Sequence, residues 1–140
     1  MNYFRYIPMS LESRPWGISV TAAGFTRIKP GMEYPPPGHP IDRAFSFAMG
    51  RTLGTFQIVF VLDGTSTFES ASCPARAVTA GSVFLLFPRE WHRYQPDRGT
   101  GWVESWLEID GRIVRRLLQE RLLDPRLPVH VLRRRARFEA

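Results

Sequence analysis

The chain has 140 residues, of which 44% are hydrophobic and 13% aromatic, enough for one folded domain and too apolar for a disordered chain. Nineteen basic and thirteen acidic residues give a formal net charge of +6, so nucleic acid and anionic membranes must be considered as partners. Cys73 is the only cysteine and no run of about 18 apolar residues occurs, which excludes a disulfide framework, a cysteine-rich zinc site and a transmembrane helix. A lone cysteine suits a reducing compartment, and we expect a cytoplasmic protein.

Glycine and proline are frequent, with 11 and 12 copies, and this favours many turns. Asp63-Gly64 is predicted to be the turn of a hairpin, and Ala80-Gly81 a further turn. The segments between such breakers are predicted as strands, with a break at Gly24 in the first: 16–26, 44–49, 55–62, 65–70, 76–79, 82–87 and 101–109. Short strands at this spacing are typical of a sandwich or barrel.

The pattern changes from strand-like to helical at Asp110. Apolar residues recur at three- and four-residue spacing through 110–123, which predicts an amphipathic helix capped by Asp110 and ended by Pro125. The charge divides at the same place: residues 1–109 hold ten basic and nine acidic residues (net +1), and residues 110–140 hold nine and four (net +5). We therefore divide the chain into a barrel-forming part, 1–109, and a helical part with a basic tail, 110–140.

Alternation along 101–109 places four large side chains on one strand face: Trp102, Glu104, Trp106 and Glu108. A carboxylate between two indole rings is typical of sugar sites, because rings pack on C–H faces while the carboxylate accepts hydrogen bonds from hydroxyl groups. The pattern fits equally a solvent-facing strand whose rings shield the sheet. The segment 88–96 holds further polar and aromatic side chains after a predicted strand, and it fits either a binding loop or an aromatic-anchored turn.

Metal and nucleophile chemistry finds little support in the sequence. The three histidines, His39, His92 and His130, form no HxH pair and no HExxH motif, so no metal site is predicted. Cys73 has no histidine near it in sequence, and no GxSxG or GxxxxGK[ST] motif occurs. We therefore expect no cofactor and a protein that is not an enzyme.

Four motifs, taken in order, are similar to those of one known family: GRTLGTFQIVFVLDGTSTFES, GSVFLLFP, WHRY and GWVESW. Over about residues 15–112 the chain resembles the N-terminal sensor domain of AraC-type transcription regulators, and most of all the group that senses sugars and related small molecules. The resemblance implies a mainly β, cupin-like jelly-roll barrel followed by a helix, with a small-molecule effector inside the barrel. It also implies a homodimer formed by helices after the barrel. Here 110–123 would be the dimer element, although its apolar stripe fits packing on its own barrel equally well.

The resemblance also assigns ligand contacts to residues of this chain. Arg51 is a candidate clamp for an anion or a hydroxyl group. The other expected contacts lie in the WHRY turn and on the inward face of the last barrel strand: His92, Tyr94, Trp102, Glu104 and Trp106. Arg89 stands where many members of the family have glycine, so the backbone geometry of that turn is open.

Three further readings concern partners and chemistry. AraC-type regulators bind DNA through a C-terminal helix-turn-helix module, and no such pattern precedes Ala140. We therefore expect either an excised or a standalone sensor domain, and favour the excised one because the basic tail ends where a linker would begin. Such a domain would reach DNA only through a module absent from this sequence. The basic tail has four arginines that could contact phosphates directly: Arg133, Arg134, Arg135 and Arg137. A solvated linker is the simpler interpretation of this charge run. A metal-dependent cupin enzyme, an isomerase or dioxygenase, remains the alternative, but its HxH pair is missing and His92 matches only the later histidine.

Overall fold

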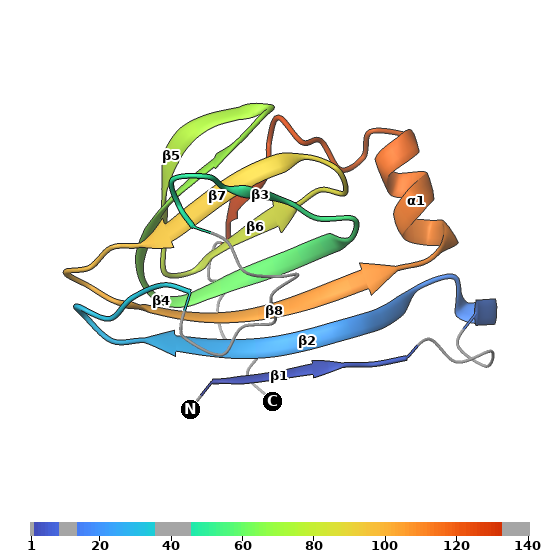
Figure 1. Cartoon of the computed structure of the whole chain (residues 1–140). Coiled ribbons are helices and arrows are strands. Elements are labelled where there is room, and N and C mark those ends of the chain that lie inside the picture. The colour runs from blue at the N-terminus through green and yellow to red at the C-terminus, as the bar shows by residue number, and fades with distance from the viewer. Residues whose placement is uncertain (1, 9–13, 36–45, 133–140) are drawn as a thin grey trace, which may run out of the picture.

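Two antiparallel layers of strands form the body of the protein in the computed structural model, which describes residues 2–8, 14–35 and 46–132 (Figure 1). The order of elements in this part of the chain is β1 (Tyr3–Tyr6), a 3-10 turn (Arg14–Trp16), β2 (Ser19–Ile28), β3 (Arg51–Thr52), β4 (Phe56–Ser70), β5 (Cys73–Thr79), β6 (Ser82–Leu86), β7 (Trp91–Pro96), β8 (Trp102–Asp110), α1 (Arg112–Gln119) and β9 (Val129–Val131). One layer runs β1-β2-β8-β4-β6-β9, and in the other β4 pairs with β5 and β7, with β3 outside β7. The result is a mainly β, cupin-like sheet with one short helix near its C-terminal end.

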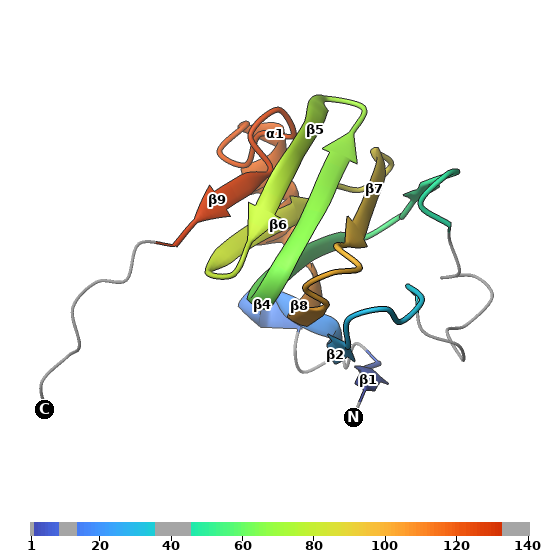
Figure 2. The same cartoon turned by 90° about the vertical axis from the view of Figure 1, so that its left-hand side faces the viewer.

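The long strand β4 belongs to both layers and turns the corner between them (Figure 2). Its first half pairs with β6 and its second half with β5 and β7. The predicted hairpin turn at Asp63-Gly64 is therefore wrong: within one continuous strand these residues pair with Val103 and Trp102 of β8, just after a bulge between Val61 and Asp63. Gly64 is needed there because its φ is +85° and a Cβ atom would overlap the backbone of Gly101.

The other strand predictions have mixed outcomes. Strands β5, β6 and β8 confirm the predictions for 76–79, 82–87 and 101–109, and residues 80–81 do form a turn. Strand β2 runs through Gly24 without the expected break. The strand predicted at 44–49 is wrong for residues 46–49, which form a turn closed by the Gly50 N–H on the Ser46 carbonyl at 2.9 Å. The rest of that segment lies outside the described residues.

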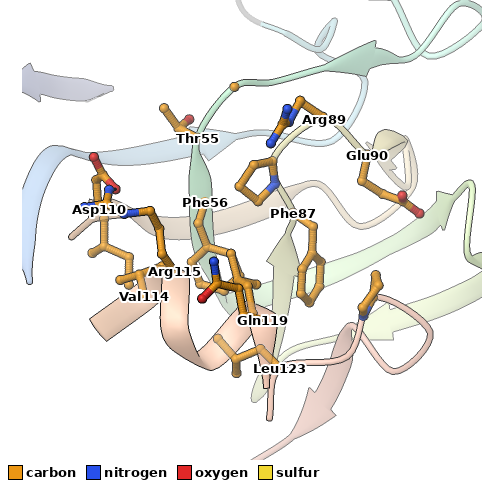
Figure 3. Close-up of a pocket in the computed structure, with 15 residues that line it drawn as sticks. Thr55, Phe56, Phe87, Arg89, Glu90, Asp110, Val114, Arg115, Gln119 and Leu123 are labelled. Carbon is orange, nitrogen blue, oxygen red and sulfur yellow. The ribbon is translucent and has the colours of Figure 1, made fainter. Parts of the chain in front are cut away.

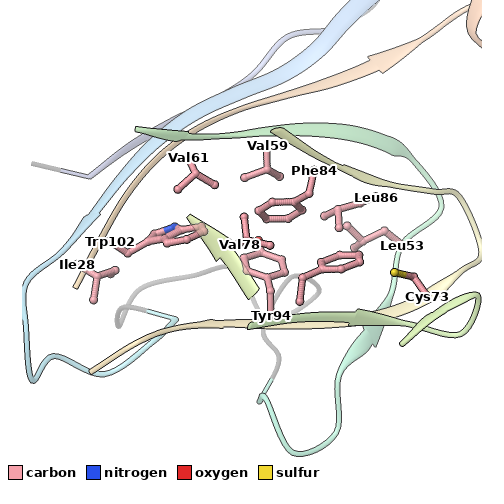
Figure 4. Packing of buried hydrophobic residues seen from close by; sticks show 11 residues of the cluster. Ile28, Leu53, Val59, Val61, Cys73, Val78, Phe84, Leu86, Tyr94 and Trp102 are labelled. Carbon is pink, nitrogen blue, oxygen red and sulfur yellow. The ribbon is translucent and has the colours of Figure 1, made fainter. Parts of the chain in front are cut away.

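The main core fills the space between the layers (Figure 4). Aromatic rings form its centre: Phe84 lies 4.9 Å from Tyr94, 5.3 Å from Phe68 and 6.4 Å from Trp102, measured between ring centroids. Each of these side chains is at most 4% exposed. Alternation explains this arrangement, because every second residue of each strand points inward.

Helix α1 covers the outer face of the first layer with Val114, which is 2% exposed and packs in a second core cluster. The helix is shorter than predicted. Gly111 stands at its N-cap and Asp110 provides no side-chain cap to it. Arg121, with φ at +55°, ends it: the Arg121 and Leu122 N–H groups bond the carbonyls of Leu118 and Leu117, so Pro125 plays no part. Among the described residues, no helix is long and apolar enough to span a membrane.

Candidate ligand-binding site

A cluster of polar and charged side chains lies within the apolar core between the two layers. Arg51 comes from β3, His92 and Tyr94 from β7, Glu104 from β8, and Tyr34 from the segment after β2. These residues reach one another because β3 pairs with β7 and the inward faces of β7 and β8 share the interior. The prediction of a turn or loop over 88–96 is wrong for residues 91–96: the WHRY motif lies on strand β7, and only residues 88–89 form a turn. The structure thus brings the predicted residues of the WHRY motif and of the last barrel strand into one place.

Arg51 is held by two side chains of β7. Its Nε donates a hydrogen bond to His92 Nε2 at 3.2 Å, and its Nη2 donates to Tyr94 Oη at 3.3 Å. His92 Nδ1 in turn lies 3.1 Å from the Glu90 carbonyl oxygen and donates to it, which fixes the neutral tautomer that accepts from Arg51. His92 therefore positions the guanidinium group, and both of its ring nitrogens are already engaged.

Burial governs the protonation of this cluster. Burial, followed by the Arg51 charge, lowers the pKa of His92 from 6.5 to about 4, so the ring is neutral at neutral pH. Burial and the Glu104 carboxylate raise the pKa of Tyr94 to about 12. The same two causes raise the pKa of Tyr34 well above its ordinary value. Both phenols therefore keep their protons at neutral pH.

Glu104 is the buried carboxyl group of the cluster, with 2% of its surface exposed. The Tyr34 hydroxyl donates to its Oε1 at 3.3 Å. Burial raises its pKa, although Trp102, Tyr34 and Arg51 favour the charged form. The indole N–H of Trp102 lies near the carboxyl group but is not placed to complete a hydrogen bond, so Glu104 Oε2 and Trp102 Nε1 both lack a partner among the described residues.

Two indole rings flank Glu104 along β8, as the alternation predicted. Trp102 is 1% exposed and belongs to the main core, while Trp106 is partly buried against it. Trp106 lies over Gly24 of the neighbouring strand β2, where a Cβ atom would overlap its ring. The missing side chain at Gly24 therefore sets the position of the Trp106 ring.

Sequence reasoning missed two residues of this region, Tyr34 and Thr26. Tyr34 follows a turn at Pro30-Gly31 and carries no periodic signal, yet its ring lies 5.8 Å from that of Tyr94. Thr26, 6% exposed, approaches Glu104 from β2. Inward alternation along β2 is the one signal that could have pointed to Thr26.

Glu108, the fourth residue of the predicted face, has a different environment. It is 4% exposed and accepts hydrogen bonds from Thr21 at 3.0 Å, Thr55 at 3.0 Å and Gln57 at 3.1 Å. Both of its carboxylate oxygens are thus bonded to neutral donors from β2, β4 and the residue before β4. We read Glu108 as a residue that ties the two strands on either side of β8 together.

The described residues offer no cluster of three or more His, Cys, Asp or Glu side chains that could hold a metal ion. His92 is committed to Arg51 and Glu90, and His130 is exposed on β9. His39 and the arginines of the basic tail lie outside the described residues.

A groove of about 670 Å³ separates α1 from the strands beneath it (Figure 3). Arg89, Glu90, Asp110 and Arg115 line its edge. Apolar side chains line the groove from both sides, the strand side first and the helical segment second: Phe56, Phe87 and Ile109, then Val114, Leu118 and Leu123. Arg89 holds φ at +61°, so the turn keeps the left-handed geometry that glycine would adopt freely. The apolar stripe of α1 does pack on its own barrel, but the fit leaves room for another element.

Comparison with known proteins places this architecture in a family. The model of the AraC-like ligand binding domain matches residues 39–139, which is most of the chain. The chain belongs to the AraC-like ligand binding domain family, a class of domains that bind small-molecule effectors. No curated protein matches it.

Three solved structures are similar to this chain, and the first of them supports the fold. The protein YhaK from Escherichia coli has a TM-score of 0.52 at 14% identity, over 79% of this chain and 45% of that one. A cupin-like protein from Thermotoga maritima has a TM-score of 0.47 at 13% identity, over 94% and 75% of the two chains. The cupin domain of Schizosaccharomyces pombe Cnp3 has a TM-score of 0.46 at 12% identity, over 85% and 71%. The chain thus spans less than half the length of YhaK, and at 14% identity the likeness to YhaK concerns the fold alone.

Proposed function

We propose that this chain is the effector-sensing and dimerisation domain of an AraC-type transcription regulator, and that its effector is a sugar or a sugar-related molecule bound inside the barrel. The observation that carries the proposal is the cluster of the partly buried Arg51 with the buried Tyr94 and Glu104, beside the indole rings of Trp102 and Trp106. Rings that pack on C–H faces and charged groups that bond hydroxyls are what such a ligand requires.

Stability alone does not explain this cluster. Removing the Glu104 carboxyl group and part of the Arg51 guanidinium group from water costs free energy, which apolar side chains at these positions would not incur. Here the cost is increased because polar atoms of Trp102 and Glu104 remain without partners among the described residues. Groups held in this way are typical of a site in which a ligand completes the hydrogen bonds.

A ligand screen tests the effector proposal directly. Thermal unfolding should be followed with neutral mono- and disaccharides and with sugar acids, for the wild type and for Trp106→Ala. A ligand at one hundred times its Kd stabilises the folded state by about 2.7 kcal/mol. At least one compound should therefore raise the Tm of the wild type by several degrees. The same compound should not raise the Tm of Trp106→Ala above the value that this variant has without ligand. Unchanged melting curves for every compound would contradict the proposal.

Dimerisation rests on the region around α1. Ile113 is 43% exposed and Leu122 is 67% exposed, although both belong to the apolar stripe. Ile113 lies on α1, which forms one wall of the groove, and Leu122 lies just after this helix. An unfilled apolar groove beside exposed apolar side chains supports a second element packing here in the assembled protein. We propose that the partner subunit supplies it, and that a DNA-binding module beyond this sequence responds to the ligand.

A further inference from the structure

We propose that the ligand places a neutral hydroxyl group between Glu104 Oε2 and Trp102 Nε1, and that this pair of atoms selects polyols over sugar acids and amino sugars. The proposal rests on the proposed function and names the ligand class of the same site. Neither atom has a hydrogen-bond partner among the described residues.

The two atoms form a donor and an acceptor that face the same interior. Trp102 and Glu104 are two residues apart on β8, so both side chains point inward, and they are 1% and 2% exposed. The indole N–H is close enough to favour the charged carboxylate, yet it does not complete a bond to it. Buried polar atoms are nearly always paired, so two unpaired ones side by side point to a group that is present when the site is filled.

A hydroxyl group fits both atoms. It accepts from the indole N–H through a lone pair and donates its proton to the carboxylate oxygen, and it can reverse the second role when Glu104 is protonated. A ligand carboxylate would accept from Trp102 but would place a second negative charge beside Glu104. An ammonium group would pair with Glu104 but would oppose the indole donor and the Arg51 charge.

The surrounding charges agree with a neutral ligand. The titratable groups that face Glu104 from β3, β7 and the segment after β2 are Arg51, Tyr94 and Tyr34, with His92 behind Arg51. Both phenols and the imidazole are uncharged at neutral pH. With Glu104 ionised, the one positive and one negative charge among these residues balance, so a neutral ligand leaves the interior neutral.

Calorimetric titration of matched ligands tests this selectivity. The probes are D-glucose, D-galactose and myo-inositol as neutral polyols, D-glucuronate and D-galacturonate as acids, and D-glucosamine as the amino sugar. We expect at least one neutral polyol to bind the wild type about tenfold or more tightly than its acid or amine counterpart, which corresponds to one charged hydrogen bond.

Three variants identify the atoms responsible. Trp102→Phe keeps an aromatic ring and removes the N–H, and should weaken the polyol about threefold to tenfold. Glu104→Gln removes the charge at constant shape and should narrow the preference for the polyol over the acid. Trp91→Phe is the matched control, because the Trp91 indole N–H bonds the Met49 carbonyl at 3.0 Å, outside the barrel. It should leave both affinities unchanged.

The outcomes separate this inference from the proposed function. An acid that binds more tightly than its neutral polyol would overturn the inference and leave effector sensing intact. Wild-type polyol affinity in both Trp102→Phe and Glu104→Gln would mean that the two atoms hold only a structural water, and would also overturn it. Failure of every probe to bind the wild type would contradict the sugar proposal, and the inference with it. Should Glu104→Gln fail to fold, Trp102→Phe and the wild-type ratio still decide.

Discussion

Gly24 on β2 lies directly opposite Trp106 on β8, and a Cβ atom added at Gly24 would overlap the indole ring. The ring therefore occupies the space that any side chain at position 24 would fill. Because Trp106 also packs against the main core beside the polar cluster, one missing side chain sets the position of a candidate ligand platform. This relationship gives the first prediction.

Gly24→Ala should displace the Trp106 ring and so reduce both stability and ligand affinity. Overpacking of this kind costs about 1–3 kcal/mol, which denaturant unfolding with tryptophan fluorescence would measure. Gly54→Ala is the matched control, because a Cβ atom at Gly54 meets nothing within 4 Å. Equal stability of the two variants would show that Trp106 moves aside without cost.

His92 should make stability depend on pH below neutrality. Its pKa is 6.5 in the unfolded chain and about 4 in the folded protein, so the unfolded state binds the proton first as the pH falls. The free energy of unfolding should therefore decrease from pH 6.5 to pH 4, by up to about 3 kcal/mol for a shift of this size. Urea unfolding of wild type and His92→Gln across this range measures the difference, and the effect of Glu104 is common to both. Parallel pH profiles would be inconsistent with a buried neutral imidazole.

Arg89→Gly should stabilise the protein by about 1 kcal/mol, because φ at +61° is strained for a residue with a Cβ atom. Arg89→Ala keeps the Cβ atom and the strain, so it serves as the control at the same position. Both variants lose the arginine side chain. The difference between their free energies of unfolding, measured by chemical denaturation, therefore reports the backbone strain at position 89. A glycine variant no more stable than the alanine variant would refute this explanation.

Leu122→Glu should shift the protein toward monomer if the α1 region forms the dimer interface. Leu122 is 67% exposed, so the substitution should cost the folded monomer little. Light scattering after size-exclusion chromatography would report the mass at several concentrations. Leu62→Glu, at a residue that is 55% exposed on β4, is the control. If the wild type and both variants have the same mass, the dimer interface lies elsewhere or the protein forms no dimer.

The sequence was informative where one face of a strand is buried. Alternation placed Trp102, Glu104 and Trp106 together on β8, and the structure puts all three on the interior side. The signal is strong there because a shift of one residue would turn every side chain to the other face. Arg51 and Tyr94 came from the resemblance instead, since β3 has only two residues and shows no period.

Errors arose where long-range pairing overrides a local signal. Asp63-Gly64 has the composition of a hairpin turn, but pairing with β8, β6, β5 and β7 keeps β4 in one strand through it. Phe47 falls in a strand-like pattern, yet it lies in a turn with the Arg93 guanidinium 4.8 Å from its ring centroid. Tyr34 had no signal at all, because its role depends on a tertiary approach to Glu104. Local composition cannot report such contacts.

The indole region of a ¹⁵N-correlated NMR spectrum tests the central claim most directly. The chain has four tryptophans, and their indole N–H groups differ in place: Trp16 is 78% exposed, Trp91 bonds Met49, and Trp102 and Trp106 lie at the barrel interior. Titration with a neutral polyol that binds in the calorimeter should move the Trp102 and Trp106 signals and leave those of Trp16 and Trp91 in place. Movement of the Trp16 or Trp91 signal alone, with Trp102 unchanged at saturation, would contradict binding inside the barrel.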